Sequence, residues 1–156
     1  MENEQIRPKF PVGMIIILIL IGWGAVSLLL GMFKLPMSQL GPTLLTGAGA
    51  IVVNLVIFGI LATIFYCILK RMMLARKLAI GWYIVSMILL VINLVSFLGN
   101  KTMYDSYYQK VLPPETYSLM TPAVITGSLV SALGFGFVIG IIVIIYLARK
   151  NDFFTN

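Results

Sequence analysis

Histidine is absent from this sequence of 156 residues, and cysteine occurs once. Without histidine the chain cannot by itself build a histidine-ligated haem, a histidine-containing zinc site or a histidine-dependent catalytic triad. One cysteine cannot close a disulfide within the chain, so the cysteine content does not indicate a redox compartment. We expect Cys67 to be a small apolar helix residue, with palmitoylation beside Lys70 and Arg71 as the alternative.

Charge is also scarce, because only 10% of the residues are Asp, Glu, Lys or Arg. The acidic residues are scattered and include no pair placed for acid and base catalysis: Glu2, Glu4, Asp105, Glu115 and Asp152. The nine methionines are dispersed as well, so we expect them to pack rather than to bind a soft metal. The sequence therefore predicts a protein that is not an enzyme and that uses no cofactor and no metal.

Four long stretches contain no charged side chain, and the mean hydropathy of the chain is +1.05. They cover Val12–Phe33, Gly47–Leu69, Leu78–Gly99 and Pro122–Leu147. Since a helix rises ~1.5 Å per residue, ~20 apolar residues cross a hydrocarbon core of ~30 Å. The sequence predicts one integral membrane domain over residues 1–156, an all-α bundle of four transmembrane helices. An inner loop (70–77) and two outer loops (34–46 and 100–121) join the helices.

Basic residues are divided unequally between the two sides of this bundle, and the net charge is +6. Eight of them lie on one side: Arg7, Lys9, Lys70, Arg71, Arg76, Lys77, Arg149 and Lys150. Because positive residues near span ends remain cytoplasmic, we expect both termini in the cytoplasm and the protein in the plasma membrane. We expect four inner-loop residues to contact the headgroups of membrane lipids, with no binding of nucleic acid: Lys70, Arg71, Arg76 and Lys77.

The two outer loops differ in pattern. The first contains three residues that break helices, which are Pro36, Gly41 and Pro42. In the second, tyrosines recur at helical spacing, at Tyr104, Tyr107 and Tyr108. This spacing predicts a short amphipathic helix at the outer interface that stops at Pro113-Pro114, with the tyrosines at headgroup depth. A surface for docking a partner is the alternative role of the tyrosines.

The polar side chains inside the four stretches are amides and hydroxyls, and six of them lie toward the outer side. They are Ser27, Asn54, Asn93, Ser96, Ser128 and Ser131. An unpaired amide in hydrocarbon costs several kcal/mol, so we expect these groups to find partners inside the bundle. Either their hydrogen bonds join helices, at ~0.6 kcal/mol each, or they line a small polar cavity for a lipid headgroup or solute.

Small residues indicate which faces of the fourth stretch pack against other helices. One face, with residues every four positions, contains Ser128, Ala132, Gly136 and Gly140. A second small face, more than a quarter-turn away, contains Gly127, Ser131 and Gly134. Small residues let two helix backbones approach closely, so this span can pack on two neighbours. We predict a helix-docking face of Ala132, Gly136 and Gly140. The second neighbour is another helix of the bundle or a helix of another protein.

Short motifs at the ends of the apolar stretches resemble a known group of proteins. Arg7-Pro8 precedes the first stretch, and Ala75-Arg76-Lys77 runs into the third. The chain closes with Tyr146-Leu147 followed by Phe153-Phe154. In this layout it resembles the small four-helix integral membrane proteins of archaea and bacteria. The resemblance implies a four-helix membrane fold and brings no activity, cofactor or site residue with it.

Two functions are compatible with these patterns. The first is a non-catalytic accessory or structural subunit of a larger membrane protein complex, acting by helix packing and interfacial anchoring. Its partners are other integral membrane subunits, in a hetero-complex rather than a homo-oligomer, and Phe153-Phe154 anchors the chain at the inner leaflet. The alternative is a small oligomeric transporter or channel for a neutral solute or lipid, lined by the layer of asparagine and serine that includes Ser27, Asn54 and Asn93.

Overall fold

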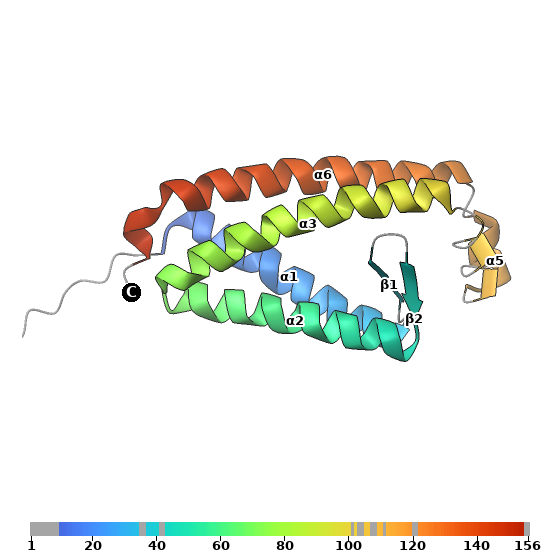
Figure 1. Cartoon of the computed structure of the whole chain (residues 1–156), viewed down its shortest axis with the longest axis horizontal. Helices are drawn as coiled ribbons and strands as arrows, with labels where there is room; N and C mark the ends of the chain where they lie inside the picture. Colours follow the sequence, from blue (N-terminus) through green and yellow to red (C-terminus); the bar gives the residue numbers. More distant parts are fainter. Residues whose placement is uncertain are drawn as a thin grey trace, which may run out of the picture.

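The computed structural model describes residues 10–34, 37–40, 43–100, 102, 105–106, 109–110, 112–119 and 122–154. Within these ranges it leaves out the side chains of residues 34, 37, 122–126, 128–129, 132–133 and 151. Four long helices make up most of the fold (Figure 1): α1 (Val12–Lys34), α2 (Ala48–Leu69), α3 (Met73–Gly99) and α6 (Pro122–Arg149). The shorter elements are strands β1 (Met37–Leu40) and β2 (Thr43–Thr46), helix α5 (Pro114–Leu119) and the 3₁₀ turn η1 (Asn151–Phe153).

Three of the helices are long and apolar enough to cross a membrane. They cover Val12–Phe33, Ala48–Leu69 and Met73–Gly99. At ~1.5 Å per residue, the 22 residues of the first two helices reach ~33 Å, about the thickness of a hydrocarbon core. The chain is therefore mostly helical and suited to a membrane. In α6, which is 28 residues long, the described apolar stretch is Gly134–Arg149.

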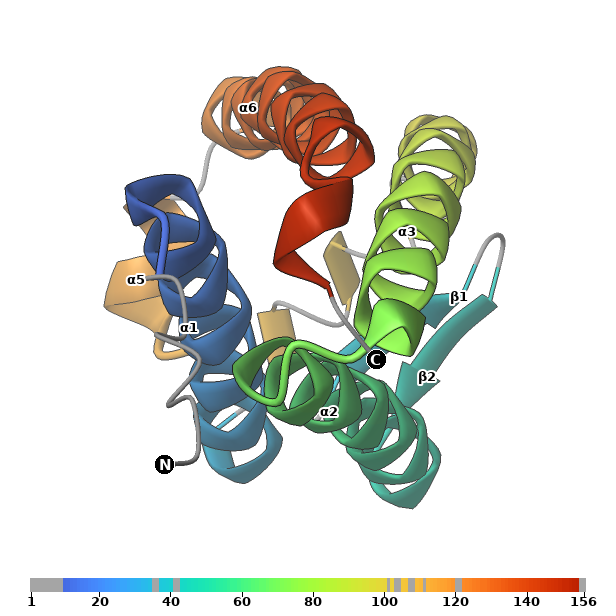
Figure 2. The ribbon, with the colours of Figure 1, turned by 90° about the vertical axis from the view of Figure 1, so that its left-hand side faces the viewer.

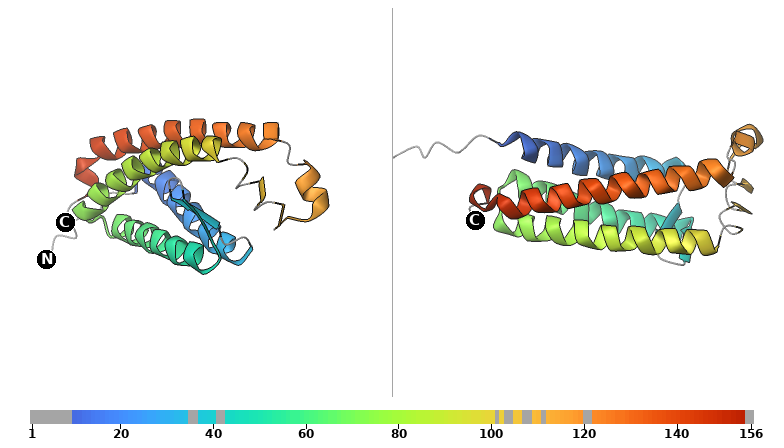
Figure 3. Two further views of the ribbon diagram at one scale, coloured as in Figure 1. Left: turned by 45° about the vertical axis from the view of Figure 1, so that its right-hand side comes forward. Right: turned by 90° about the horizontal axis from the view of Figure 1, so that it is seen from above.

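The long helices form two antiparallel pairs, α1 with α2 and α3 with α6 (Figures 1 and 3). The pairs meet at one end of the bundle, built from residues 10–14, 68–76 and 147–154, which we call the closed end. They diverge toward the opposite end, which holds β1, β2 and α5 and which we call the hairpin end. Figure 2 looks onto the closed end, where η1 lies among the ends of the four long helices.

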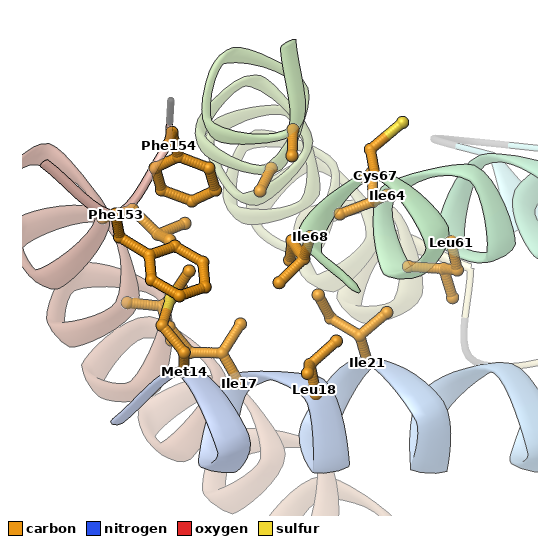
Figure 4. Close-up of a cluster of buried hydrophobic side chains, with 14 residues drawn as sticks. Met14, Ile17, Leu18, Ile21, Leu61, Ile64, Cys67, Ile68, Phe153 and Phe154 are labelled. Carbon is orange, nitrogen blue, oxygen red and sulfur yellow. The ribbon is translucent and has the colours of Figure 1, made fainter. Parts of the chain in front are cut away.

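The most deeply buried side chains gather at the closed end. Met14, Ile68 and Leu147 are fully inaccessible, and they come from α1, α2 and α6. Phe153 and Phe154 fold back into the same cluster, so they close the bundle from inside rather than anchoring it in a leaflet (Figure 4). Their position corrects the prediction from the sequence. Each aromatic ring buries a large apolar surface against several helices. In the headgroup layer, part of that surface would be exposed to water.

The hairpin of β1 and β2 corrects the expectation of an all-α fold. The strands pair antiparallel, with Met37 opposite Thr46 and Leu40 opposite Thr43. The loop was correctly predicted to break the helix, but its backbone hydrogen-bonding groups still need partners, and strand pairing satisfies them locally. Gly47 then connects β2 to α2 with φ of 60°, a left-handed conformation that glycine adopts without steric cost.

The inner loop is much shorter than predicted, because α3 begins at Met73 and includes Arg76 and Lys77. Residues 74–77 are all good helix formers, and their charges mark where the apolar stretch ends rather than where the helix ends. The turn is a Schellman motif: the N–H of Met72 donates to the carbonyl of Cys67 (3.0 Å) and that of Arg71 to the carbonyl of Ile68 (2.9 Å). Arg71 occupies the left-handed position, with φ of 58°, where glycine is usual.

In the second outer loop, helical residues 109–110 are followed by a bend at Leu112 and a non-helical Pro113, so the prolines do separate helices as predicted. The sequence did not predict the further helix, α5, that begins at Pro114. Proline suits a first helical position since its missing N–H has no partner there, and the N–H of Tyr117 donates to the carbonyl of Pro113 at 2.9 Å. Residues 102, 105–106 and 109–110 are helical as well. The predicted interfacial tyrosines lie outside the described residues: Tyr104, Tyr107 and Tyr108.

Candidate functional site

The β-hairpin connects the two helix pairs at the hairpin end through one reciprocal contact. The Nε2 of Gln39 in β1 donates to the backbone carbonyl of Asn93 in α3 at 2.8 Å. The Nδ2 of Asn93 donates back to the backbone carbonyl of Gln39 at 3.3 Å. The hairpin also packs on α2, so it bridges the α1–α2 pair to the α3–α6 pair. Asn93, which is half-buried, thus finds a partner inside the chain.

Two buried polar side chains accompany this junction. Ser38 precedes Gln39, so its side chain points to the opposite face of β1, and it is buried. Asn54 on α2 is only 6% exposed. Neither side chain forms a hydrogen bond with another residue that the structure describes.

The six predicted polar residues differ in their surroundings. Ser27 and Ser131 are exposed, and Ser96 is half-buried. Asn93 is bonded to the hairpin, and Asn54 is buried on another helix. The side chain of the sixth residue, Ser128, lies outside the described set. Depth along the helix was predictable from sequence position, but the direction in which each side chain points was not.

The small residues of α6 divide between an occupied face and an open face. A Cβ built on Gly140 would lie 2.9 Å from Met87 Sδ of α3, and one built on Gly136 would lie 3.3 Å from Leu90 Cδ1. These two glycines therefore let α3 approach closely within the same chain. The third predicted residue of this face, Ala132, has a side chain outside the described set. The other face is exposed, and no described atom lies within 4 Å of a Cβ built on its two glycines, Gly127 and Gly134.

Helix α3 buries little of its surface within the chain. Of its 27 residues, only Ala75, Ala79 and Phe97 are buried, and two of these lie in its first two turns. Large apolar side chains are exposed along the rest, including Ile88 and Val95. One face of α3 contacts α6, and its hairpin-end part meets β1. Most of its apolar surface therefore faces outward, toward lipid or another protein.

At the closed end, two basic residues contact other parts of the chain. The Arg71 guanidinium lies 4.9 Å from the ring centroid of Phe10 and 5.1 Å from that of Phe153, within the range of cation–π contact. Arg76 Nη2 donates to the carbonyl of Ala148 at 3.2 Å, in the last turn of α6. That carbonyl lacks an intrahelical partner, so Arg76 joins the start of α3 to the end of α6.

The other two predicted headgroup residues, Lys70 and Lys77, are exposed. Lys70 Nζ lies 5.8 Å from the ring centroid of Tyr66, and its charge remains accessible. Lys77 lies one turn into α3. The four basic residues of the predicted inner loop therefore split into two that join parts of the chain and two that face outward.

Reactive chemistry is sparse in the described part of the chain. Among the described residues, no group of three or more His, Cys, Asp or Glu side chains could hold a metal ion. Cys67 is a buried free thiol within the apolar cluster. Outside the long helices, Tyr117 Oη donates to Asp105 Oδ1 at 2.9 Å. This hydrogen bond, with desolvation and the negative charge of Asp105, raises the pKa of Tyr117 above its ordinary value of 10.0.

Sequence reasoning missed Gln39 and Ser38, although the turn signal at Gly41-Pro42 lies beside them. Two strand-forming tetrapeptides around that dipeptide are a hairpin signal, but they are too short to separate from a plain loop. The role of Arg76 was also missed. The position of Arg76 just before an apolar stretch is compatible both with contact to lipid headgroups and with capping of a helix end.

Comparison of the chain with protein-family models, with curated proteins and with solved structures gives no significant match. The resemblance to small four-helix membrane proteins therefore stays a prediction. Function has to be argued from the geometry of the chain itself.

Proposed function

We propose that this protein is a non-catalytic subunit of a larger membrane protein complex, acting by helix packing. The proposal rests on the open small face of α6, formed by Gly127, Ser131 and Gly134. In lipid, apolar surface alone does not drive helix association, because acyl chains are as apolar as leucine. A face of small residues does favour it, since backbones can then approach closely and gain van der Waals contact.

The same helix also has a small face that is already occupied. Gly136 and Gly140 already receive Leu90 and Met87 of α3. The open face has the same kind of residues and no described neighbour at either glycine. A helix of another integral membrane subunit is the occupant that we propose for it, in a hetero-complex. The exposed apolar surface of α3 is available to the same partner.

In this proposal the four long helices all span the membrane, with both termini on the cytoplasmic side of the plasma membrane. Residues 122–148 of α6 contain no charged side chain, so its length and composition suit a fourth span. Most basic residues lie near the closed end and few lie at the hairpin end, and this difference supports the orientation. The hairpin and α5 then lie toward the outer side.

The test is to isolate the tagged chain at native abundance in a mild detergent and to measure the mass and composition of its particle. We expect a particle several times larger than the 17.2 kDa chain, with other polypeptides in fixed ratio. Gly134→Leu should remove those polypeptides by filling the open face. Gly59→Leu is the matched control, because Gly59 is also an exposed helical glycine with no described atom near a built Cβ.

Two outcomes would contradict the proposal. One is a particle containing only one or a few copies of this chain. The other is equal loss of partners in Gly134→Leu and Gly59→Leu, which would show a general effect of the leucine rather than a docking face.

A second candidate function, a small oligomeric transporter for a neutral solute, is favoured by Asn54. This buried amide has no described hydrogen-bonding partner and lies in the half of α2 nearer the hairpin end. An Asn54→Leu variant in vesicles should then lose solute flux while keeping the helical content and unfolding midpoint of the parent protein. If flux is absent from the parent, or is unchanged by the substitution, the transporter function is excluded.

A further inference from the structure

We propose that the chain binds a single anionic glycerophospholipid at the closed end, with one acyl chain in a groove between α1 and α6. The groove is a cavity of about 230 Å³. Its walls are Ile16 and Leu20 of α1 and Ile139 and Ile142 of α6, all of which are exposed at its rim. The site lies apart from the open small face of α6 and does not depend on the proposed function.

The floor of the groove belongs to the buried cluster, and its end is a contact between Tyr146 and Gly13. Ile17 and Val143, at 3% and 4% exposure, form its floor. Toward the closed end, Tyr146 packs directly on Gly13, where an added Cβ would overlap the phenol ring. The ring and the glycine backbone therefore form a fixed stop at the closed-end limit of the groove.

The length and the apolar lining of the groove suit a hydrocarbon chain. The lining extends over eight residues on each helix, from position 13 to 20 and from 146 back to 139. These are seven steps of ~1.5 Å, or ~10 Å. The accessible surface of the lining is apolar, so it offers no partner to a polar solute.

The charge at the closed end selects the headgroup. Lys150 Nζ lies 6.0 Å from the ring centroid of Tyr146, which brings an exposed cation to the groove. Arg149 is exposed beside it. Among the described residues of this end and the adjoining turn of α3, four basic residues are exposed, which are Lys70, Lys77, Arg149 and Lys150, and one acidic residue is exposed, Asp152. An anionic phosphodiester headgroup with a neutral alcohol complements this excess, whereas a zwitterionic headgroup does so less well.

The experiment uses the full chain in vesicles that contain phosphatidylglycerol or phosphatidylcholine with a photoreactive group on one acyl chain. Labelled residues are mapped by mass spectrometry. We expect labels on the groove walls of α1 and α6, with phosphatidylglycerol preferred about fivefold. Lys150→Gln should abolish that preference. Even labelling around all helices, or equal labelling by both lipids in the parent protein, would overturn the proposal.

Variants that fill the groove separate specific binding from general lipid contact. Ile142→Trp should lower groove labelling at least fivefold, and Ile141→Trp, an exposed position of α6 outside the lining, should leave it unchanged. Leu20→Trp fills the groove from the opposite wall. It replaces Ile142→Trp as the test variant if Ile142→Trp lowers the unfolding midpoint. Undiminished labelling in a folded groove variant would refute the assignment.

Discussion

At the closed end, Phe154 is 2% exposed and packs with Phe153, Met14 and Ile68, and arginines join the ends of different helices. At the hairpin end, the helix pairs diverge, and two hydrogen bonds between Gln39 and Asn93 connect β1 to α3. The same four helices are thus held by interlocking apolar side chains at one end and by a polar bridge at the other.

The difference indicates which end of the bundle can move. Removing a buried aromatic ring from a packed cluster costs several kcal/mol, because a cavity forms. A hydrogen bond between membrane helices contributes ~0.6 kcal/mol, because the separated groups find other partners. We therefore expect the α1–α2 and α3–α6 pairs to pivot about the closed end and to change their separation at the hairpin end.

The largest expected effect comes from breaking the closed end with Phe154→Ala. We expect the free energy of unfolding to fall by about 3–5 kcal/mol, since a nearly inaccessible ring is removed. Unfolding in mixed detergent micelles, followed by circular dichroism, measures the change. Phe135→Ala is the control, because Phe135 on α6 is 71% exposed, and its loss should have little effect. Equal losses in the two variants would contradict the described core.

A smaller effect is expected from Arg76→Met at the same end. The variant keeps an apolar stem but loses the hydrogen bond from Arg76 to the carbonyl of Ala148, so unfolding should become easier by about 1.5 kcal/mol. The same micelle assay applies, with Lys77→Met as control because Lys77 is an exposed neighbour on α3. If Lys77→Met costs as much, the effect is one of helix charge rather than of the bond between α3 and α6.

At the hairpin end, Asn93→Leu should cost only ~0.6 kcal/mol. Its main effect should be a wider and broader separation of the helix pairs. Spin labels at Val52 of α2 and Val95 of α3, both exposed, report that distance by pulsed electron paramagnetic resonance. Gln39→Leu removes the other bond and should act similarly, whereas Ser27→Leu at an exposed position should not. An unchanged distance distribution in both variants would show that the bridge does not set the separation.

The smallest effect concerns Tyr117 and Asp105, beyond the long helices. The protonated phenol donates to the carboxylate, which raises the pKa of Tyr117. A raised pKa in the folded state means that the contact stabilises below the ordinary pKa of about 10 and is lost as the pH rises through the raised value. In Asp105→Ala the pKa of Tyr117 should fall toward its ordinary value. Nuclear magnetic resonance of ring-labelled tyrosine, assigned with Tyr117→Phe, measures the titration, and an unchanged pKa would refute the contact.

Hydropathy and charge were enough to predict where the helices run. The predicted stretches and the observed helices agree closely for α1, α2 and α6, because an uncharged run of about 20 residues has few alternatives to a helix in a membrane. The start of α3 was misplaced by five residues, since Arg76 and Lys77 end the apolar run without ending the helix. The helix-breaking residues of the first outer loop were recognised from the sequence, and the hairpin of β1 and β2 was not.

The pairing of side chains far apart in the chain was decided only by the tertiary structure. Gln39 meets Asn93 across 54 positions, and Arg76 meets Ala148 across 72. Periodicity assigns each residue to a face of its own helix, but the rotation of that helix against its neighbours depends on packing summed over the whole bundle. The sequence by itself therefore determined the helices, the basic end and the small faces of α6. Which small face α3 covers, and where Phe153 and Phe154 lie, follow from packing at the closed end.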